Sequence, residues 1–387
     1  MGDRRPVLTV NGGSSSLKLA LFDVGPPLTR LAQGSLSGAG RPIAIGALMD
    51  WIDQHAGPLG LAAVGHRVVH GGPDHYEPQA INAELLSALR GLCPVDPEHL
   101  PQQIQWIEAL QRRFPGLAQV ACFDTAFHRH LPRVAQQLAI PRRYEALGLR
   151  RFGFHGLSYQ FLLEELARVA GPSAAQGRVI LAHLGSGASL AAVKEGRSQD
   201  TSMGFSPAGG IPMGTRSGDL DPGIVAYLAQ TEGMDARTFN AMVHERSGLL
   251  GVSGSSADMG VLLGLEAHDL RAAEAVALFC YQAKKWVGAY AAVLGGLDCL
   301  VFSGGIGERA PLVRERICQG LEFLGVELDR GANLKGEGVI SAAGSRVSVR
   351  VMPTDEELLL ARLTCHALGL GQAWSSPADI HRRGTLP

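Results

Sequence analysis

Two stretches of the chain share one pattern of apolar and polar positions. Val7–Val10 is a short β-branched apolar run, Asn11–Ser16 is rich in glycine and serine, and Leu17–Phe22 is a second apolar run. Val179–Val193, which reads VILAHLGSGASLAAV, repeats this order. Each stretch is typical of a β-hairpin with a glycine-rich turn. Because each hairpin opens one half of the chain, the pattern predicts a duplicated architecture.

Apolar residues at helical spacing follow both hairpins. They predict helices over His99–Phe114, Arg129–Leu147, Leu270–Leu294 and Pro311–Leu324. Between the last two, the run CLVFSGGIGER (Cys299–Arg309) predicts a strand that enters a glycine-rich turn at a helix N-terminus. Unpaired N–H groups at such a terminus favour anions. This alternation of strands and helices predicts an α/β fold with two domains.

The segment Ser202–Pro222, SMGFSPAGGIPMGTRSGDLDP, predicts a shaped loop because glycine and proline recur in it. Arg216 lies in its polar centre, where a guanidinium can offer two parallel donors to a phosphoryl or carboxylate group. A surface arginine in a glycine-rich loop is the simpler alternative. A second arginine, Arg67 in GHRVVHGG, and the glycine turns favour the phosphoryl-transfer interpretation, although no Walker motif occurs.

Composition narrows the class of protein. The 387 residues suit about two domains. Lys and Arg number 35 against 36 Asp and Glu, so the net charge of −1 provides no general attraction for nucleic acid or an anionic membrane. The six cysteines form no CxxC pair, which indicates free thiols in a reducing compartment. The N-terminal apolar run is too short for a signal peptide, so we expect a cytoplasmic protein without a membrane span.

The run DTSMGFSPAGGIPMGTRSGDLDP (Asp200–Pro222) closely resembles the signature of the acetate kinase family, ATP-dependent kinases of short carboxylic acids. The resemblance extends along nearly the whole chain, through VNGGSSSLK, GHRVVHGG, FDTAFH, RRFGFHG, SGLLGVSG, SGGIGER and PTDEEL. It implies two RNase H-like α/β domains of the actin, hexokinase and Hsp70 type, with an active-site cleft between them. Domain I is expected at 1–150 plus 356–387, and domain II at 151–355.

The activity implied by the resemblance is reversible, Mg²⁺-dependent transfer of the ATP γ-phosphoryl group to acetate by direct in-line displacement. The products are acetyl phosphate and ADP, Mn²⁺ is expected to substitute for Mg²⁺, and the family suggests a homodimer. A short carboxylic acid is already ionised at neutral pH, so the reaction needs charge neutralisation more than a base. Asp124 is therefore assigned to Mg²⁺ or its water shell, against the simpler role of a helix cap.

The resemblance also implies the site residues. Catalytic roles fall to Arg67, Asp124, His155 and Arg216. The acyl group is expected to contact Arg67, Val69, Val95, Phe154 and Pro207. The nucleotide is expected to contact Asn11, Ser14, Ser16, Lys18, His183, Gly185, Ser186, Gly187, Gly304, Gly305, Ile306 and Gly307. The metal is expected near Asn11 and Glu356, a carboxylate that a helix N-terminus also favours.

Four positions depart from the family pattern: Ser186 and Arg309 replace asparagines, Asp355 adds a carboxylate beside Glu356, and Tyr159 stands near a position where the family has a histidine. They leave three alternatives open. The chain could be a propionate or butyrate kinase, it could use another phosphoryl donor, or it could bind a nucleotide as a scaffold without making acyl phosphate.

Overall fold

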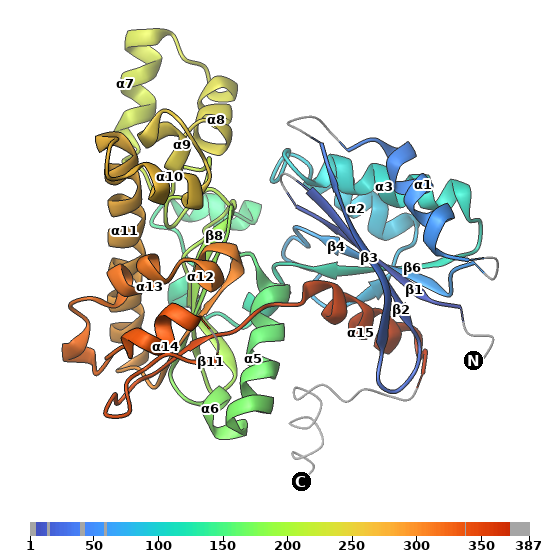
Figure 1. The fold of residues 1–387 in the computed structure, drawn as a ribbon. Helices are drawn as coiled ribbons and strands as arrows, with labels where there is room; N and C mark the ends of the chain where they lie inside the picture. The colour runs from blue at the N-terminus through green and yellow to red at the C-terminus, as the bar shows by residue number, and fades with distance from the viewer. Residues whose placement is uncertain (1–4, 14–15, 39–42, 58–59, 337, 372–387) are drawn as a thin grey trace. The chain divides into compact units, whose positions relative to one another are not determined.

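The computed structural model describes residues 5–13, 16–38, 43–57, 60–336 and 338–371 (Figure 1). The chain divides into two compact units. Unit 1 comprises Met1–Ala126 and Asp355–Pro387, and unit 2 comprises Phe127–Thr354. Among the described residues, none of the helices combines the length and the apolar character needed to span a lipid bilayer.

Unit 1 is built on a six-stranded sheet in the order β3-β2-β1-β4-β6-β5. Its strands are β1 (Val7–Gly12), β2 (Ser16–Asp23), β3 (Thr29–Ser37), β4 (Ala63–Val68), β5 (Gln79–Ala80) and β6 (Ala118–Phe123). Its helices are α1 (Ile45–His55), α2 (Ala83–Leu92), α3 (Leu100–Arg113) and α15 (Glu356–Leu368). β1 and β2 form the predicted hairpin, and β1, β4 and β6 run parallel.

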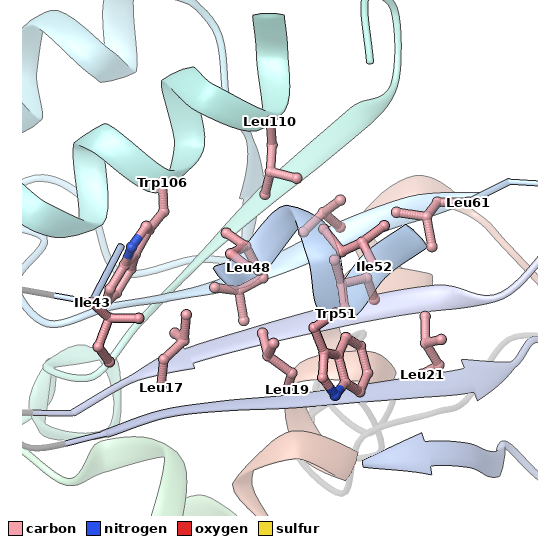
Figure 2. Close-up of a cluster of buried hydrophobic side chains, with 13 residues drawn as sticks. Leu17, Leu19, Leu21, Ile43, Leu48, Trp51, Ile52, Leu61, Trp106 and Leu110 are labelled. Atoms are coloured by element: carbon pink, nitrogen blue, oxygen red, sulfur yellow. The ribbon is translucent and has the colours of Figure 1, made fainter. Parts of the chain in front are cut away.

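Both faces of this sheet are covered, which explains why β1 is buried along its whole length and β2 is buried over Leu19–Phe22. Alternate residues such as Leu8 and Leu19 join Trp51 of α1 and Trp106 of α3 in one buried cluster (Figure 2). The intervening residues face α15, which packs Ala361 against Phe22. The two faces follow from the two-residue period of a strand.

Unit 2 contains a second six-stranded sheet in the order β11-β12-β10-β7-β8-β9. Its strands are β7 (Val179–Leu184), β8 (Ala188–Lys194), β9 (Arg197–Thr201), β10 (Cys299–Ser303), β11 (Gly338–Val339) and β12 (Ser348–Val351). Its α-helices are α4 (Arg133–Gln136), α5 (Gly156–Ala170), α6 (Pro172–Gln176), α7 (Gly223–Glu232), α8 (Ala236–Glu245), α9 (Gly248–Ser253), α10 (Met259–Leu265), α11 (Leu270–Leu294), α12 (Gly304–Arg309), α13 (Pro311–Cys318) and α14 (Arg330–Lys335). Short 3₁₀ turns, η1 to η3, cover Ala126–His128, Arg142–Leu147 and Glu322–Leu324.

The core of unit 2 forms around the same kind of sheet. On one face, Leu162 and Leu166 of α5 pack with Leu181 of β7 and Val301 of β10. The long helix α11 also packs on the sheet, against β7, β8 and β9. Its apolar residues recur at helical spacing along 25 residues, which explains why the sequence predicts its bounds well.

The two sheets confirm the predicted duplication. In each, an antiparallel hairpin is extended by a third antiparallel strand on one side and by two parallel strands on the other. Each also ends in a two-residue antiparallel edge strand, β5 or β11. The strand order is that of the predicted RNase H-like fold.

The segment after β6 differs from the sequence-based expectation. A helix over Arg129–Leu147 is wrong: Pro132 and Pro141 interrupt it, leaving only the four-residue α4 and the turn η2. The first boundary between the units also stands at Ala126, where residue 150 was expected. The rings of Phe127 and His128 lie 5.8 and 5.7 Å from that of Tyr159, which attaches this segment to unit 2.

Candidate functional site

In unit 1, Arg67 of β4 and Asp124, which follows β6, form a buried ion pair. Arg67 Nη2 donates to Asp124 Oδ2 at 2.7 Å, and the two side chains are 11% and 1% exposed. They meet because β4 and β6 are adjacent parallel strands that end at the same edge of the sheet. Burial lowers the pKa of Arg67, but the charges of Asp124, Glu356 and Asp96 together outweigh that effect and hold the pKa above its ordinary value. Arg67 therefore stays charged and oriented.

The carbonyl oxygen of Gly12, at the end of β1, connects this ion pair to the first glycine turn. It accepts hydrogen bonds from Arg67 Nη1 at 2.5 Å and from Gln103 Nε2 at 3.4 Å. Gln103 also accepts from the N–H of Val69 at 3.0 Å. A Cβ on Gly12 would lie 2.3 Å from the ring of Trp106. Helix α3, which carries Gln103 and Trp106, therefore fixes the turn beside Arg67.

Asn11, also on β1, joins two acidic side chains from the start of α15. Its Nδ2 donates to Glu356 Oε2 at 2.8 Å and to Glu357 Oε1 at 2.9 Å. Burial, and then the like charge of Glu356, raise the pKa of Glu357, which Lys18 and the Asn11 amide oppose only in part. Lys18 is the cross-strand neighbour of Asn11. The two carboxylates thus repel each other across a single amide.

This donor set suits a magnesium ion that arrives with a phosphate ligand. Carboxylate and amide oxygens are the ligands that Mg²⁺ prefers, and a cation would relieve the repulsion between Glu356 and Glu357. The described residues contain no group of three or more His, Cys, Asp or Glu side chains arranged for a metal. The protein would therefore supply one or two ligands, and phosphate and water the remainder.

In unit 2, two basic side chains converge on the second glycine turn, Gly185–Gly187. The Gly185 N–H donates to the Gly187 carbonyl oxygen at 3.0 Å and closes the turn. A Cβ on Gly187 would lie 3.2 Å from His155 Nε2 and 3.4 Å from Arg216 Nη1. Glycine leaves that space open for a ligand. The arrangement suits an anion that approaches the backbone between two nitrogen donors.

The loop that carries Arg216 is tied directly to this turn. The Gly214 N–H donates to the Ser186 carbonyl oxygen at 2.9 Å, and the Met213 N–H donates to the Arg216 carbonyl oxygen at 3.0 Å. Gly218 has a φ of 72°, and a Cβ there would lie 2.6 Å from a backbone carbonyl oxygen. Only glycine fits such a position. The glycines of the signature therefore bring the arginine to a fixed place at the turn.

His155 is held by both its backbone and its ring. Its φ of 58° is left-handed, which is unusual for a residue with a side chain and is common at functional sites. Its Nδ1 lies 2.9 Å from Ser189 Oγ, which in turn lies 2.5 Å from Tyr159 Oη. Its ring centroid is 4.4 Å from that of His183, whose Nδ1 lies 2.8 Å from Ser158 Oγ. These contacts aim Nε2 of His155 at the glycine turn.

The third glycine turn begins at Gly304 and lies against the end of β7. Gly304 has a φ of 77°, and a Cβ there would lie 2.7 Å from the Leu184 carbonyl oxygen. The far end of the turn is held by Arg314, a fully buried residue that donates to the carbonyl oxygens of Gly307 at 2.8 Å and Glu308 at 2.9 Å. The second and third glycine turns are thus neighbours in unit 2.

Two of the departures from the family pattern have local explanations. Asp355 caps α15 by accepting from the Leu358 N–H at 3.0 Å, and it pairs with Arg30 at 2.5 Å. Arg309 folds back over the third turn, where a Cβ on Gly305 would lie 3.0 Å from its Nη2. Asp355 therefore has a structural role, whereas Arg309 adds a positive charge beside the turn.

The structure distributes the predicted site residues over both units. Unit 1 contains Asn11, Ser16, Lys18, Arg67, Val69, Val95, Asp124 and Glu356, whereas Ser14 lies outside the described residues. Unit 2 contains Phe154, His155, His183, Gly185, Ser186, Gly187, Pro207, Arg216, Gly304, Gly305, Ile306 and Gly307. Of the predicted acyl contacts, Val69, Phe154 and Pro207 are buried and Val95 is half-buried. Pro207 touches the site directly, because its carbonyl oxygen lies 3.4 Å from Arg216 Nη1.

Three residues of these networks were missed by the sequence analysis. Glu357 adjoins a predicted residue, and its place in the first turn of α15 was a usable signal. Ser189 follows the second glycine turn and bonds His155, but an isolated serine in a strand carries no signal. Gln103 bonds Gly12 from 91 residues away, and no local pattern predicts such a contact.

Residues 32–362 match the family model described as the Acetokinase family. Among curated proteins, the chain is similar to the acetate kinase of Rhodopseudomonas palustris (strain TIE-1). The two are 44% identical over 386 residues, which covers 92% of this chain and 96% of that protein. The acetate kinase of Rhizobium meliloti is 43% identical over 386 residues, with coverage of 92% and 97%.

Solved structures give the same result. The crystal structure of Porphyromonas gingivalis acetate kinase superposes with a TM-score of 0.84 at 36% identity, covering 94% of this chain and 100% of that one. A propionate kinase from Francisella tularensis superposes with a TM-score of 0.85 at 34% identity, covering 93% and 98%. The two-domain α/β fold of these kinases is therefore also the fold of this chain.

Proposed function

We propose that this chain, which belongs to the acetokinase family, transfers the γ-phosphoryl group of ATP to acetate and forms acetyl phosphate and ADP reversibly. Membership of the family makes it an enzyme, a phosphotransferase with a carboxyl group as acceptor. The observation that carries the proposal is the convergence of His155 Nε2 and Arg216 Nη1 on Gly187. Two nitrogen donors at one glycine turn suit a phosphoryl group in flight.

In this proposal, unit 2 binds the transferred group. Arg216 donates to the equatorial phosphoryl oxygens, whose charge rises as the bond to ADP breaks. His155 donates a further hydrogen bond to the same group. The second and third glycine turns contact the phosphates and the nucleoside through Gly185–Gly187 and Gly304–Gly307. Direct in-line transfer needs no covalent enzyme intermediate, because the acceptor oxygen attacks phosphorus as the ADP oxygen leaves.

Unit 1 binds the acceptor and the other phosphates. Arg67 pairs with the acetate carboxylate, which is already ionised at neutral pH and has no proton to lose. In this proposal Asp124 orients Arg67, which it contacts at 2.7 Å, in place of the Mg²⁺ role expected from the sequence, and it does not act as a base. The first glycine turn and Lys18 contact phosphate oxygens. Arg67 and Arg216 each lower the barrier by neutralising charge rather than by moving a proton.

Magnesium fits the acidic end of unit 1. Asn11 and Glu356 would hold it, with Glu357 beside them, and Mn²⁺ has the same preference for oxygen ligands. When bound, the ion neutralises charge on the ATP phosphates. Asn11 already orients both carboxylates, with contacts of 2.8 and 2.9 Å. Replacing Glu356 should therefore weaken use of the nucleotide more than binding of acetate.

We expect apolar residues contributed by each unit to set the acyl preference. Val69, Phe154 and Pro207 are buried and Val95 is half-buried, and acetate is the acid named for the curated relatives. An apolar pocket distinguishes one methylene group by only about 1 to 3 kcal/mol. Propionate is the second candidate, because one similar structure is a propionate kinase.

We also propose a homodimer in the cytoplasm. Helix α7, labelled in Figure 1, has no buried residue. Val225 and Tyr227 on it are 44% and 65% exposed. An uncovered apolar helix of this kind suits a second copy of the chain. All six cysteines are free thiols, as expected in a reducing compartment. Sedimentation velocity should give twice the chain mass of 40.9 kDa.

The acceptor is tested by trapping acyl phosphate with hydroxylamine. Purified protein is incubated with MgATP and, in parallel, acetate, propionate or butyrate. The highest kcat/KM is expected with acetate, followed by propionate. A higher kcat/KM with propionate or butyrate would make that acid, and not acetate, the preferred substrate. No trapped product with any acid, despite measurable ATP binding, would favour another phosphoryl donor or a scaffold.

A further inference from the structure

Three side chains in contact, Tyr159, Ser189 and His155, connect the interior of unit 2 to the second glycine turn. Tyr159 is completely buried in the first turn of α5, and its Oη lies 2.5 Å from Ser189 Oγ. Ser189, also buried, lies on β8 with its Oγ 2.9 Å from His155 Nδ1. The opposite ring nitrogen, Nε2, faces Gly187 and Arg216. The proposed function uses His155 but does not explain Tyr159 or Ser189.

We infer that Tyr159 is a positioning residue that acts through Ser189 to keep the proton of neutral His155 on Nε2. The inference rests on the proposed function, because it assigns Nε2 the task of donating to the transferred phosphoryl group. Tyr159 stands near the position where the family pattern has a histidine.

The direction of the hydrogen bonds follows from the chemistry of the three groups. A phenol, with an ordinary pKa of about 10, is far more acidic than an aliphatic alcohol and is the better donor. Tyr159 therefore donates to Ser189 Oγ, and their short separation fits a strong donor. The hydroxyl of Ser189 has one hydrogen, which remains for His155 Nδ1. An imidazole that accepts at Nδ1 carries its single proton on Nε2.

This tautomer matters because of what Nε2 faces. A Cβ at Gly187 would lie 3.2 Å from Nε2 and 3.4 Å from Arg216 Nη1, so both nitrogens border the same small space. With the proton on Nε2, both are donors and the space suits an oxyanion. In the opposite tautomer, Nε2 would present a lone pair to the phosphoryl oxygens and repel them. Tyr159 thus decides whether His155 helps or opposes transfer.

The packing around Tyr159 makes the hydroxyl separable from the ring. Phe127, His128 and His155 surround the ring, with centroid distances of 5.8, 5.7 and 6.5 Å. Tyr159→Phe keeps these contacts and removes only the donor. Tyr290 on α11 provides a matched control. It is 1% exposed, and among the described residues its hydroxyl has no hydrogen-bond partner. Tyr290→Phe deletes the same atom from the same kind of interior.

The tautomer is measured directly by long-range ¹H–¹⁵N NMR on the full chain labelled at histidine, with His155 assigned by comparison with His155→Gln. The parent and Tyr290→Phe should both show His155 protonated at Nε2. Tyr159→Phe should gain the Nδ1-protonated form, because Ser189 is then free to accept from the ring. Ser189→Ala should lose the preference as well. A parent protonated at Nδ1, or a Tyr159→Phe spectrum equal to that of Tyr290→Phe, overturns the inference.

Kinetics give an independent readout of positioning. Tyr159→Phe should lower kcat about tenfold while the KM for ATP and for acetate stays within about twofold. Ser189→Ala should lower kcat by the same factor. The double variant should be no slower than either single variant, because each of these changes breaks the same series of hydrogen bonds to His155. Tyr290→Phe should equal the parent. A parent that makes no acyl phosphate overturns the proposed function alone, because the NMR comparison decides the tautomer without turnover.

Discussion

The two units have the same sheet topology but place different chemistry at the same edge. In unit 1, the parallel strands β4 and β6 end in a buried ion pair, Arg67 with Asp124. In unit 2, the matching strands are β10 and β12, and β10 ends at Ser303 and runs into the glycine turn of Gly304. The ends of β4 and β6 in unit 1 therefore present charged side chains, whereas the end of β10 in unit 2 presents the backbone of a glycine turn.

The two hairpins differ in the same sense. Asn11 in β1 holds two carboxylates, whereas His183 at the corresponding end of β7 contacts a serine hydroxyl and stacks near His155. A shared fold therefore does not determine which groups occupy a site. In unit 1 the charged groups hold one another, while in unit 2 left-handed backbone conformations at glycines and at His155 bring Arg216 and His155 to the second glycine turn.

The largest effect is expected from breaking the buried ion pair of unit 1. Arg67→Ala leaves Asp124, which is 1% exposed, without its cation, so unit 1 should lose about 3 to 5 kcal/mol of unfolding free energy. Urea titration with hydrogen exchange at β4 and β6 measures this. Arg67→Ala/Asp124→Ala is the control and should recover part of the loss. A single variant within about 1 kcal/mol of the parent would contradict the structural role of the pair.

Arg216 should behave in the opposite way. Its side chain is oriented by a glycine-rich loop, so Arg216→Ala should lower kcat by about 10²- to 10³-fold. The free energy of unfolding should change by no more than about 1 kcal/mol. Acyl phosphate trapping and urea titration measure the two quantities on one preparation. Unchanged turnover would show that Arg216 has no catalytic role. A large loss of unfolding free energy would show that Arg216, like Arg67, stabilises the fold.

The charged edge also predicts a dependence on pH. Burial lowers the pKa of His66, beside Arg67 on β4, from 6.5 to about 4, although a hydrogen bond to Gln119 opposes the shift. The folded state thus favours the neutral ring, and its contribution to stability is present above pH 6.5 and lost as the pH falls toward 4. At about 1.4 kcal/mol per unit of pKa, the loss is about 3 kcal/mol.

The test is the slope of unfolding free energy against pH, measured in the parent and in His66→Asn. The variant should flatten the slope between pH 6.5 and 4, whatever its absolute stability. His55→Asn, at an exposed position on α1, should retain the slope of the parent. Equal slopes in the parent and His66→Asn would show that another group causes the acid sensitivity.

The smallest effect is expected at the third glycine turn, which follows β10 in unit 2. Gly304→Ala places a Cβ 2.7 Å from the Leu184 carbonyl oxygen at a φ of 77°, so it should cost about 1 to 3 kcal/mol and raise the KM for ATP more than that for acetate. Gly295→Ala is the matched control, because its φ is 72° and nothing lies within 4 Å. If both variants cost the same, the close approach to Leu184 has no role.

The sequence predicts those parts of the structure that depend on neighbouring residues. Both hairpins, the strand that enters the third glycine turn, and α11 follow from periodicity and glycine placement within short windows. The helix over Arg129–Leu147 failed because two prolines outweigh a weak apolar pattern. Arg67 and Asp124 were both predicted as site residues, but their pairing across 57 positions was not, because only the sheet order brings them together.

The residues around the predicted site were harder to foresee. Nothing near Gln103 indicates that it bonds Gly12, and Ser189 has no motif of its own. Tyr159 appeared in the sequence only as a departure from a family pattern. Its position in the structure, 2.5 Å from Ser189, gives that departure a physical meaning.

The central claim is that a carboxylate oxygen attacks the γ-phosphorus of ATP. It is tested most directly by ³¹P NMR after a reaction of MgATP with acetate labelled at both oxygens with ¹⁸O. The account predicts acetyl phosphate that carries one ¹⁸O on phosphorus, seen as an isotope shift, together with unlabelled ADP. ATP consumed to unlabelled inorganic phosphate, with both ¹⁸O atoms left in acetate, would contradict it.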